Sequence, residues 1–263
     1  MADEPVVLTR EGPAATILLN RPAKLNALDE SEQRGLAEAM AAIAHDASVR
    51  VAIITGAGRA FCAGGDIQTM VDLKTEHHSA TFRAALESGN AIVRAIRRLP
   101  KPVIASVNGP AAGAGVSLAM ACDLRIASDG ATFTQAFAGI GLHPDWGGTF
   151  FLPRLIGMGR AIEMFFLGEP VNAAEAQRIG LVNFVVPHDR LAAETRKLGE
   201  RLAAQPALPM SLLKVALYER SKTELNSMME TEVEAQMKCF DSEEFAEGLN
   251  AFLQKRKPKF EGA

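Results

Sequence analysis

Three glycine-rich loops, each placed after a short apolar run, contain the residues with the clearest capacity for chemistry. They span residues 56–66, 108–115 and 139–148. In α/β sheets such loops lie at the carboxyl ends of strands, where ligands bind. Glycine lets a backbone N–H group approach a ligand closely, and N–H groups from two loops can converge on one developing oxyanion. The loops therefore indicate either tight turns alone or a site that stabilises a negatively charged oxygen.

An acidic residue, Asp145, stands in the third loop between Pro144 and Trp146, the one tryptophan of the chain. An aromatic neighbour and the exclusion of water would raise the pKa of this carboxyl group toward the range of a general base. Pro-Asp-x-Gly is also common turn chemistry, and Asp145 is equally well placed to cap a helix over residues 149–156. The residues alone leave both interpretations open.

Common cofactor motifs are incomplete in this sequence. Phe61 and Leu118 stand where the third glycine of a dinucleotide-binding G-x-G-x-x-G motif would be, and the chain has no phosphate-binding G-x-x-x-x-G-K-[ST] motif. The three cysteines form no C-x-x-C pair, which predicts no metal site and a reducing, cytoplasmic compartment. We therefore expect neither a metal nor a bound cofactor.

Composition narrows the class of protein further. The chain has 263 residues, a formal net charge of −3 and 48% hydrophobic residues, which is typical of a globular protein and disfavours nucleic-acid binding. Residues 102–122 carry no charge and are long enough to span a bilayer. Asn108-Gly109-Pro110 interrupts them, however, and the N-terminus lacks the pattern of a signal peptide. We expect a buried strand, turn and helix, and no membrane segment.

Apolar runs bounded by turn residues predict strands that are buried on both faces, at residues 16–19, 51–55, 103–107 and 124–127. Helices are expected between them, one capped by Asp29 and ending near His45, and one with Phe82, Leu86, Gly89, Val93 and Ile96 on a single face. From residue 157 the chain is expected to be almost entirely helical. Capping patterns stand at Asn172 and Ser221, and a short extended connector stands at 184–187. This order predicts an α/β fold with a parallel or mixed sheet.

Five collinear segments resemble the crotonase superfamily of enoyl-CoA hydratases and isomerases. They are residues 20–28, 61–67, 101–109, 118–123 and 152–157. The resemblance implies an α/β fold with a ββα spiral core at residues 1–195, which binds acyl-CoA, and a helical trimerisation region at 196–263. It also implies a homo-oligomer, either a trimer or a dimer of trimers. The substrate would be an acyl-CoA thioester, with no cofactor beyond the coenzyme A that the substrate carries.

The resemblance also assigns site residues. The two N–H donors of the family's oxyanion hole match Gly65 and Ala114, and the second position is usually glycine, so the backbone of Ala114 must have a negative φ. Contacts to coenzyme A match residues of three segments, namely Lys24 and Leu25, then Ala63, Gly64, Gly65, Asp66 and Ile67, and basic residues around 255–257. Phe137, His143 and Trp146 are expected to line the acyl pocket, with Met70, Phe82, Leu86 and Leu142 as further candidates.

The same comparison puts hydration in doubt. Hydratases of the family carry two glutamates, and Ser117 and Phe137 stand at their positions here. The third loop is closest to the epoxide-isomerase-like branch of phenylacetate breakdown, which places an aspartate where this chain has Asp145. One carboxylate suffices for a 1,3-proton shift, since it can remove a proton from one carbon of the enolate and return it to another. We therefore expect an enoyl-CoA double-bond isomerase, or a related ring isomerase, with Asp145 as proton shuttle.

Three alternatives remain at this point. One is an enoyl-CoA hydratase despite the missing glutamates. Another is a thioester hydrolase, because residues 115–119 are one residue from the G-x-S-x-G motif around Ser117. The last is a non-enzymatic binder, although the net charge disfavours RNA as its ligand.

Overall fold

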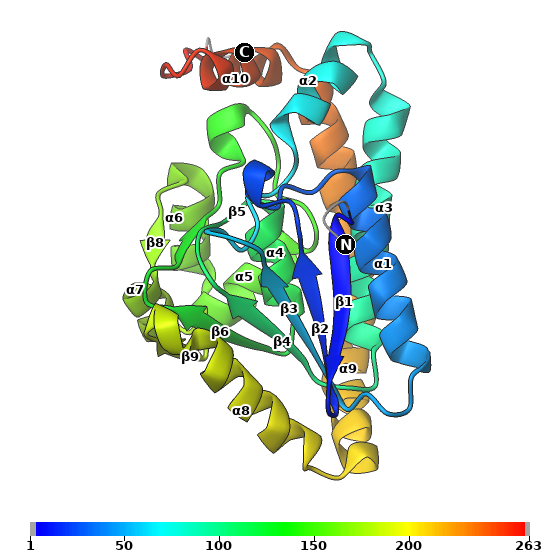
Figure 1. Cartoon of the computed structure of the whole chain (residues 1–263). Coiled ribbons are helices and arrows are strands. Elements are labelled where there is room, and N and C mark those ends of the chain that lie inside the picture. Colours follow the sequence, from blue (N-terminus) through cyan, green and yellow to red (C-terminus); the bar gives the residue numbers. More distant parts are fainter. Residues whose placement is uncertain (1–3, 261–263) are drawn as a thin grey trace.

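The computed structural model describes residues 4–260, without the side chains of residues 219 and 220 (Figure 1). Its centre is a six-stranded sheet with the strand order β1-β2-β3-β4-β6-β9. The strands are β1 (Val6–Glu11), β2 (Ala14–Leu19), β3 (Val51–Gly56), β4 (Val103–Val107), β6 (Leu124–Ser128) and β9 (Phe184–Val186). β1 and β2 form an antiparallel hairpin, and every other neighbouring pair is parallel. The predicted mixed α/β sheet is confirmed.

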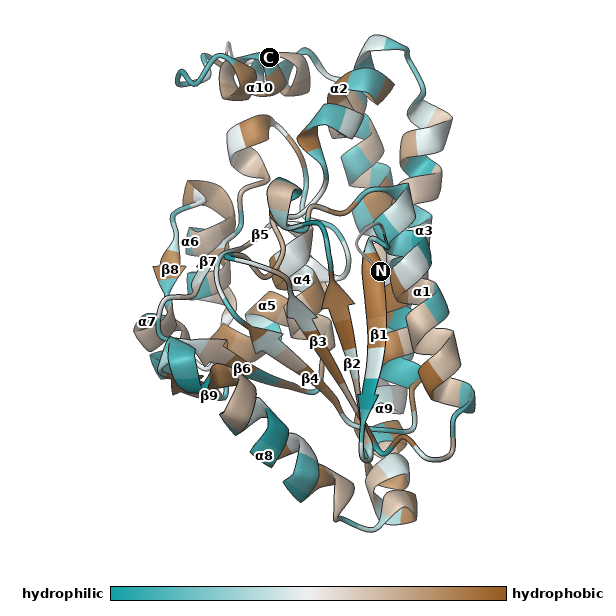
Figure 2. Ribbon diagram, in the orientation of Figure 1, coloured by the Kyte–Doolittle hydropathy of each residue, from teal (hydrophilic) through white to brown (hydrophobic). Residues whose placement is uncertain are grey.

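The central strands are buried on both faces, as their continuous apolar runs predicted. In β3, Ala52 and Ile54 belong to the main core, whereas Val51 and Ile53 belong to a second cluster on the opposite face. Leu191 and Leu198 of α8 (Leu191–Ala203) complete that second cluster. Figure 2 shows the apolar residues concentrated along these strands.

Two amphipathic helices cover the other side of the sheet. In α1 (Glu30–His45), the carboxylate of Asp29 accepts hydrogen bonds from the backbone N–H groups of Ser31 and Glu32, as its capping pattern predicted. α3 (Ser79–Arg98) buries the predicted face and packs against α1 and α9 (Ala207–Asp241). These helices share the main hydrophobic core with the sheet.

Shorter elements surround the carboxyl ends of the strands. A small sheet has the order β5-β7-β8, from β5 (Ala111–Ala112), β7 (Thr132–Thr134) and β8 (Val171–Asn172). The helices here are α2 (Ile67–Thr75), the fully buried α4 (Ala114–Ala121), α5 (Gly148–Ile156), α6 (Met158–Leu167) and α7 (Ala173–Arg178). Single turns of 3₁₀ helix lie at η1 (Pro22–Lys24), η2 (Ala138–Ile140) and η3 (His188–Arg190). Within residues 4–260, no helix is long and apolar enough to cross a membrane.

The C-terminal part differs from expectation at two places. Ser221 does not begin a helix but lies inside the 35-residue α9, where its hydroxyl donates to the carbonyl of Tyr218, so that capping prediction was wrong. The predicted connector at 184–187 contains β9, which extends the main sheet because it pairs with β6. α10 (Glu243–Leu253) follows, capped by Ser242. The domain boundary expected at residue 195 falls within α8 and stays a prediction.

Candidate active site

The segment before α1 is folded tightly against the first glycine loop. Leu25 and Asn26 both have positive φ values, an arrangement that asparagine tolerates better than most residues. The fully buried Asn26 amide donates to the carbonyl groups of Ala57, Ala60 and Phe61. Its side-chain oxygen accepts from the N–H of Arg21. This one side chain therefore fixes both the turn and the end of β3.

The first and second glycine loops touch through their backbones. The Ala112 N–H donates to the Cys62 carbonyl at 2.9 Å, and the Phe61 N–H donates to the Pro110 carbonyl at 3.0 Å. A Cβ atom at Gly64, where φ is +88°, would lie 2.8 Å from the Ala112 carbonyl oxygen and 3.5 Å from the Ala114 nitrogen. Only glycine allows this approach, so the glycines here do more than form turns.

The N–H groups of Gly65 and Ala114 have no acceptor among the residues that the structure describes. Ala114 is the first residue of α4, where intrahelical hydrogen bonds leave the N–H free and the helix dipole favours negative charge. Gly113 takes the positive φ of +51° at this turn, and Ala114 is not among the residues with positive φ. Ala114 therefore has the negative φ that was expected of an alanine at the second position of the oxyanion hole.

Asp145 is buried in the third loop, with 8% of its surface exposed. Its Oδ2 atom accepts a hydrogen bond from Gln236 Nε2 at 3.2 Å, and its Oδ1 atom is buried without a partner in the described part of the chain. Burial, and secondarily the charge of Glu232, raise the pKa of Asp145 to about 8. The N-cap of α5 is Gly147, so the carboxylate of Asp145 does not cap that helix.

Two side chains of α9 hold the third loop, and neither was predicted from the sequence. The buried Glu232 carboxylate accepts from Gly147 N–H at 2.7 Å and from both the N–H and the hydroxyl of Thr149. Gln236 accepts from His143 N–H at 2.8 Å while its amide donates to Asp145. Burial raises the pKa of Glu232 to about 7. Together they anchor the loop on both sides of Asp145.

A signal for these two residues does exist in the sequence. In the second half of α9 the buried positions are Leu225, Met229, Glu232, Val233, Gln236 and Phe240. Their spacing of three to four residues places the two polar side chains on the helix face that packs inward. A buried glutamate and glutamine on such a face need hydrogen-bonding partners.

Apolar side chains close over the loops. The Phe137 ring lies 3.5 Å from the Cβ position of Gly113, and the Met70 methyl group lies over Gly65. Trp146 packs on Gly89 of α3, where a Cβ atom would lie 2.1 Å from its Nε1 atom. Five of the seven predicted pocket residues gather in one cluster, namely Met70, Phe82, Leu86, Phe137 and Leu142. Trp146 belongs to the main core instead, and His143 is half-buried.

The candidate contacts to coenzyme A fall into one continuous region and one separate segment. Leu25 O accepts from Ala63 N–H at 3.0 Å, which brings the exposed Lys24 on η1 near the first loop. Asp66 caps α2 and pairs with Arg21 at 3.4 Å, so it braces the loop.

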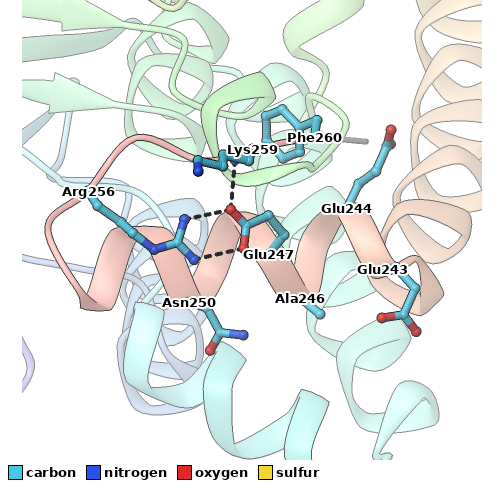
Figure 3. A pocket seen from close by; sticks show the side chains of 8 residues that line it. All are labelled: Glu243, Glu244, Ala246, Glu247, Asn250, Arg256, Lys259 and Phe260. Carbon is cyan, nitrogen blue, oxygen red and sulfur yellow. Dashed lines mark hydrogen bonds and ion pairs between the residues drawn. The ribbon is translucent and has the colours of Figure 1, made fainter. Parts of the chain in front are cut away.

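In the C-terminal tail, Arg256 makes two hydrogen bonds to Glu247 beside a cavity of about 640 Å³ on α10 (Figure 3). No described interaction joins this tail to the first loop. Nor do three metal-ligating side chains gather anywhere in residues 4–260.

Comparison with known proteins assigns the family. The family model described as "Enoyl-CoA hydratase/isomerase" matches residues 9–263. The chain belongs to the enoyl-CoA hydratase/isomerase family.

Named relatives of this family are close in sequence and fold. A crotonyl-CoA hydratase of Syntrophomonas wolfei is 40% identical over 99% of both chains. A 1,2-epoxyphenylacetyl-CoA isomerase of Escherichia coli is 38% identical over 94% of both. The crystal structure of an enoyl-CoA hydratase from Mycobacterium avium subsp. paratuberculosis superimposes with a TM-score of 0.88 and is 38% identical, covering 98% of this chain and 99% of the other. The crotonase superfamily and fold predicted from the sequence are confirmed.

Proposed function

We propose that this member of the enoyl-CoA hydratase/isomerase family is an isomerase that moves a double bond of an acyl-CoA thioester. The observation that supports this most is the buried Asp145, a carboxyl group whose pKa is raised to about 8 and whose Oδ1 atom has no hydrogen-bond partner within the described residues. A general base works best when its pKa lies near the operating pH.

In the proposed mechanism the thioester carbonyl oxygen accepts hydrogen bonds from Gly65 N–H and Ala114 N–H. Asp145 removes a proton from the γ-carbon of a 2-enoyl group, and the electron pair shifts to the carbonyl oxygen as an enolate. The two N–H groups stabilise that oxyanion, and one such donor is typically worth about 3 kcal/mol. Asp145 then returns the proton to the α-carbon, which leaves a 3-enoyl product.

Hydratase activity is the second candidate, because the relatives include proteins named as hydratases at up to 40% identity. The residues at the two family glutamate positions disfavour it. Ser117 is fully buried and its hydroxyl has no hydrogen-bond partner among the described residues, and Phe137 is apolar. The isolated Ser117 hydroxyl also disfavours the thioester hydrolase, since a serine nucleophile needs an adjacent base.

Product analysis with 2-enoyl-CoA and 3-enoyl-CoA in H₂¹⁸O separates the two candidates. An isomerase interconverts the two substrates without incorporating ¹⁸O, whereas a hydratase forms a labelled 3-hydroxyacyl product. Labelled hydroxyacyl product as the main species would contradict the proposal.

The same experiment in D₂O tests the role of Asp145. We expect Asp145→Asn to bind acyl-CoA normally but to slow exchange of the α- and γ-protons by about 10²- to 10⁴-fold. Asp189→Asn, at an exposed position on η3, is the matched control and should exchange at the wild-type rate. If Asp145→Asn exchanged these protons at the wild-type rate, Asp145 would be a turn residue without a role in proton transfer.

A further inference from the structure

A cluster of arginines at the end of α3 remains without a role in the proposed reaction. Arg94, Arg97 and Arg98 stand on one face of the helix, because residues three and four apart are neighbours. They line a cavity of about 120 Å³ together with Tyr218, Ser221 and Asn226 of α9. Arg98 precedes β4, and Lys214 of α9 donates to the Lys101 carbonyl next to it. The cavity therefore lies near the amino ends of the strands, at the opposite edge of the sheet from the glycine loops.

Arg97 is held in place by aromatic rings rather than by an anion. Its guanidinium carbon lies 3.3 Å from the centroid of the Tyr218 ring and 5.0 Å from that of Phe151. Its Nε atom is buried and has no hydrogen-bond partner in the described part of the chain. A buried cationic donor without an acceptor destabilises a fold, and native structures normally satisfy such groups.

Asp123, a carboxylate whose charge acts on Arg97, is already engaged by other groups. Asp123 accepts from Lys214 Nζ at 2.7 Å, from the Tyr218 hydroxyl at 2.6 Å and from Val103 N–H at 2.7 Å. No described ion pair involves Arg94 or Arg98, and no described side chain that lines the cavity is acidic. The wall thus consists of the three arginines, Lys222, the polar side chains of Tyr218, Ser221 and Asn226, and the apolar Val215 and Leu225.

We propose that this cavity binds one small tetrahedral oxyanion, with inorganic phosphate as the ligand. Guanidinium groups match phosphate oxygens with paired N–H donors, and Ser221 and Asn226 supply neutral donors on the facing helix. The volume fits a single such anion, since one water molecule takes up about 30 Å³ of liquid and drug-sized ligands need about 300 Å³ or more. The bound anion would join α3, which supports Trp146, to α9, which anchors the loop of Asp145.

Isothermal titration with inorganic phosphate, against sodium chloride at equal ionic strength, tests the proposal. We expect phosphate to bind with a stoichiometry of one per chain. Arg94→Gln/Arg98→Gln should weaken binding at least about tenfold, and this double variant leaves the packing of Arg97 intact. Arg97→Lys keeps the charge but loses the planar fork, and should also weaken binding. Arg201→Gln removes an exposed arginine of α8 and should bind as the wild type does.

Three results would overturn the proposal. The first is equal phosphate affinity in the wild type and the double variant. The second is no phosphate binding by either protein, as expected if a second copy of the chain fills the cavity. The third is competition by coenzyme A, because phosphate binding that disappears in saturating coenzyme A would place the anion in the substrate site. Since neither readout depends on turnover, the outcome is distinguishable from failure of the proposed function.

Discussion

The contribution of the Asp145 carboxyl group to the free energy of unfolding depends on pH, because its pKa is about 8 in the folded protein and 3.8 as a free side chain. Below about pH 4 it is protonated in both states and costs nothing. Between these two values the unfolded chain gives up its proton while the folded protein keeps it, so stability falls as pH rises. Above about pH 8 the full penalty of a buried carboxylate is present.

We therefore expect Asp145→Asn to be more stable than the wild type, with a difference that grows from acid to alkaline pH. An amide is neutral at every pH, so the variant is not destabilised by a buried negative charge. For a chain of this size, about 1 kcal/mol corresponds to a rise in Tm of about 2–4 °C. Thermal unfolding measured at several pH values checks this, with Asp189→Asn as the control. A difference that shrinks with rising pH would contradict the raised pKa.

Glu232 acts on Asp145 through charge as well as through the loop that it anchors. Glu232→Gln removes a negative charge that raises the pKa of Asp145, so the rising limb of kcat/KM against pH should move to lower pH. Glu230→Gln changes an exposed glutamate two residues earlier on the same helix and should leave the profile in place. A merely structural role for Glu232 would lower Tm without shifting that midpoint.

At the level of elements, the position of Ala114 at the start of α4 allows its backbone N–H to be tested separately from its side chain. Ala114 is the first helical residue, a position where proline is well tolerated because that N–H makes no intrahelical bond. We expect Ala114→Pro to fold but to lose about 10²- to 10³-fold in kcat, since it removes one oxyanion donor. Ala114→Gly keeps the N–H and should retain activity. Wild-type rates in Ala114→Pro would exclude Ala114 from the oxyanion hole.

The elements that the sequence predicted well are those with local signals. The strands at β3 and β4 follow from continuous apolar runs, α1 follows from the Asp29 cap, and the face of α3 follows from its spacing. The prediction that Ser221 caps a helix was wrong because a capping pattern is a local signal. Helix α9 continues through Ser221 because it is stabilised by packing against α3.

The site was predictable only in part for the same physical reason. Glycine loops and Asp145 are visible in sequence because turns and charges are properties of short segments. Glu232 and Gln236 lie about ninety residues from the loop that they hold, and only the fold brings them to it. Their hydrogen bonds depend on how α9 crosses the third loop, which no local pattern specifies.

Across the whole molecule, two apolar surfaces lie apart from each other in Figure 1 and have no covering element in the described chain. One is on α6, where Met158, Ile162, Phe166 and Leu167 are exposed. The other is on the first half of α9, with Leu208, Leu212, Leu213 and Leu217, whereas the exposed Val215 lines the arginine cavity. Patches of this kind mark interaction surfaces. Two different patches on one chain fit a head-to-tail interface, which closes into a ring when the rotation permits.

Such a ring is compatible with the trimer, or dimer of trimers, that the resemblance to the crotonase superfamily implies, and we expect that assembly rather than a monomer. Sedimentation at micromolar concentration should give three or six times the chain mass of 28.1 kDa. Leu212→Glu/Leu213→Glu places two charges on the α9 surface, where they would be desolvated in an interface, and should shift the mass toward that of one chain. Arg201→Gln, on the neighbouring α8, should leave the assembly unchanged. A wild-type protein that sediments as a monomer would show that these leucines serve no interface between copies of the chain.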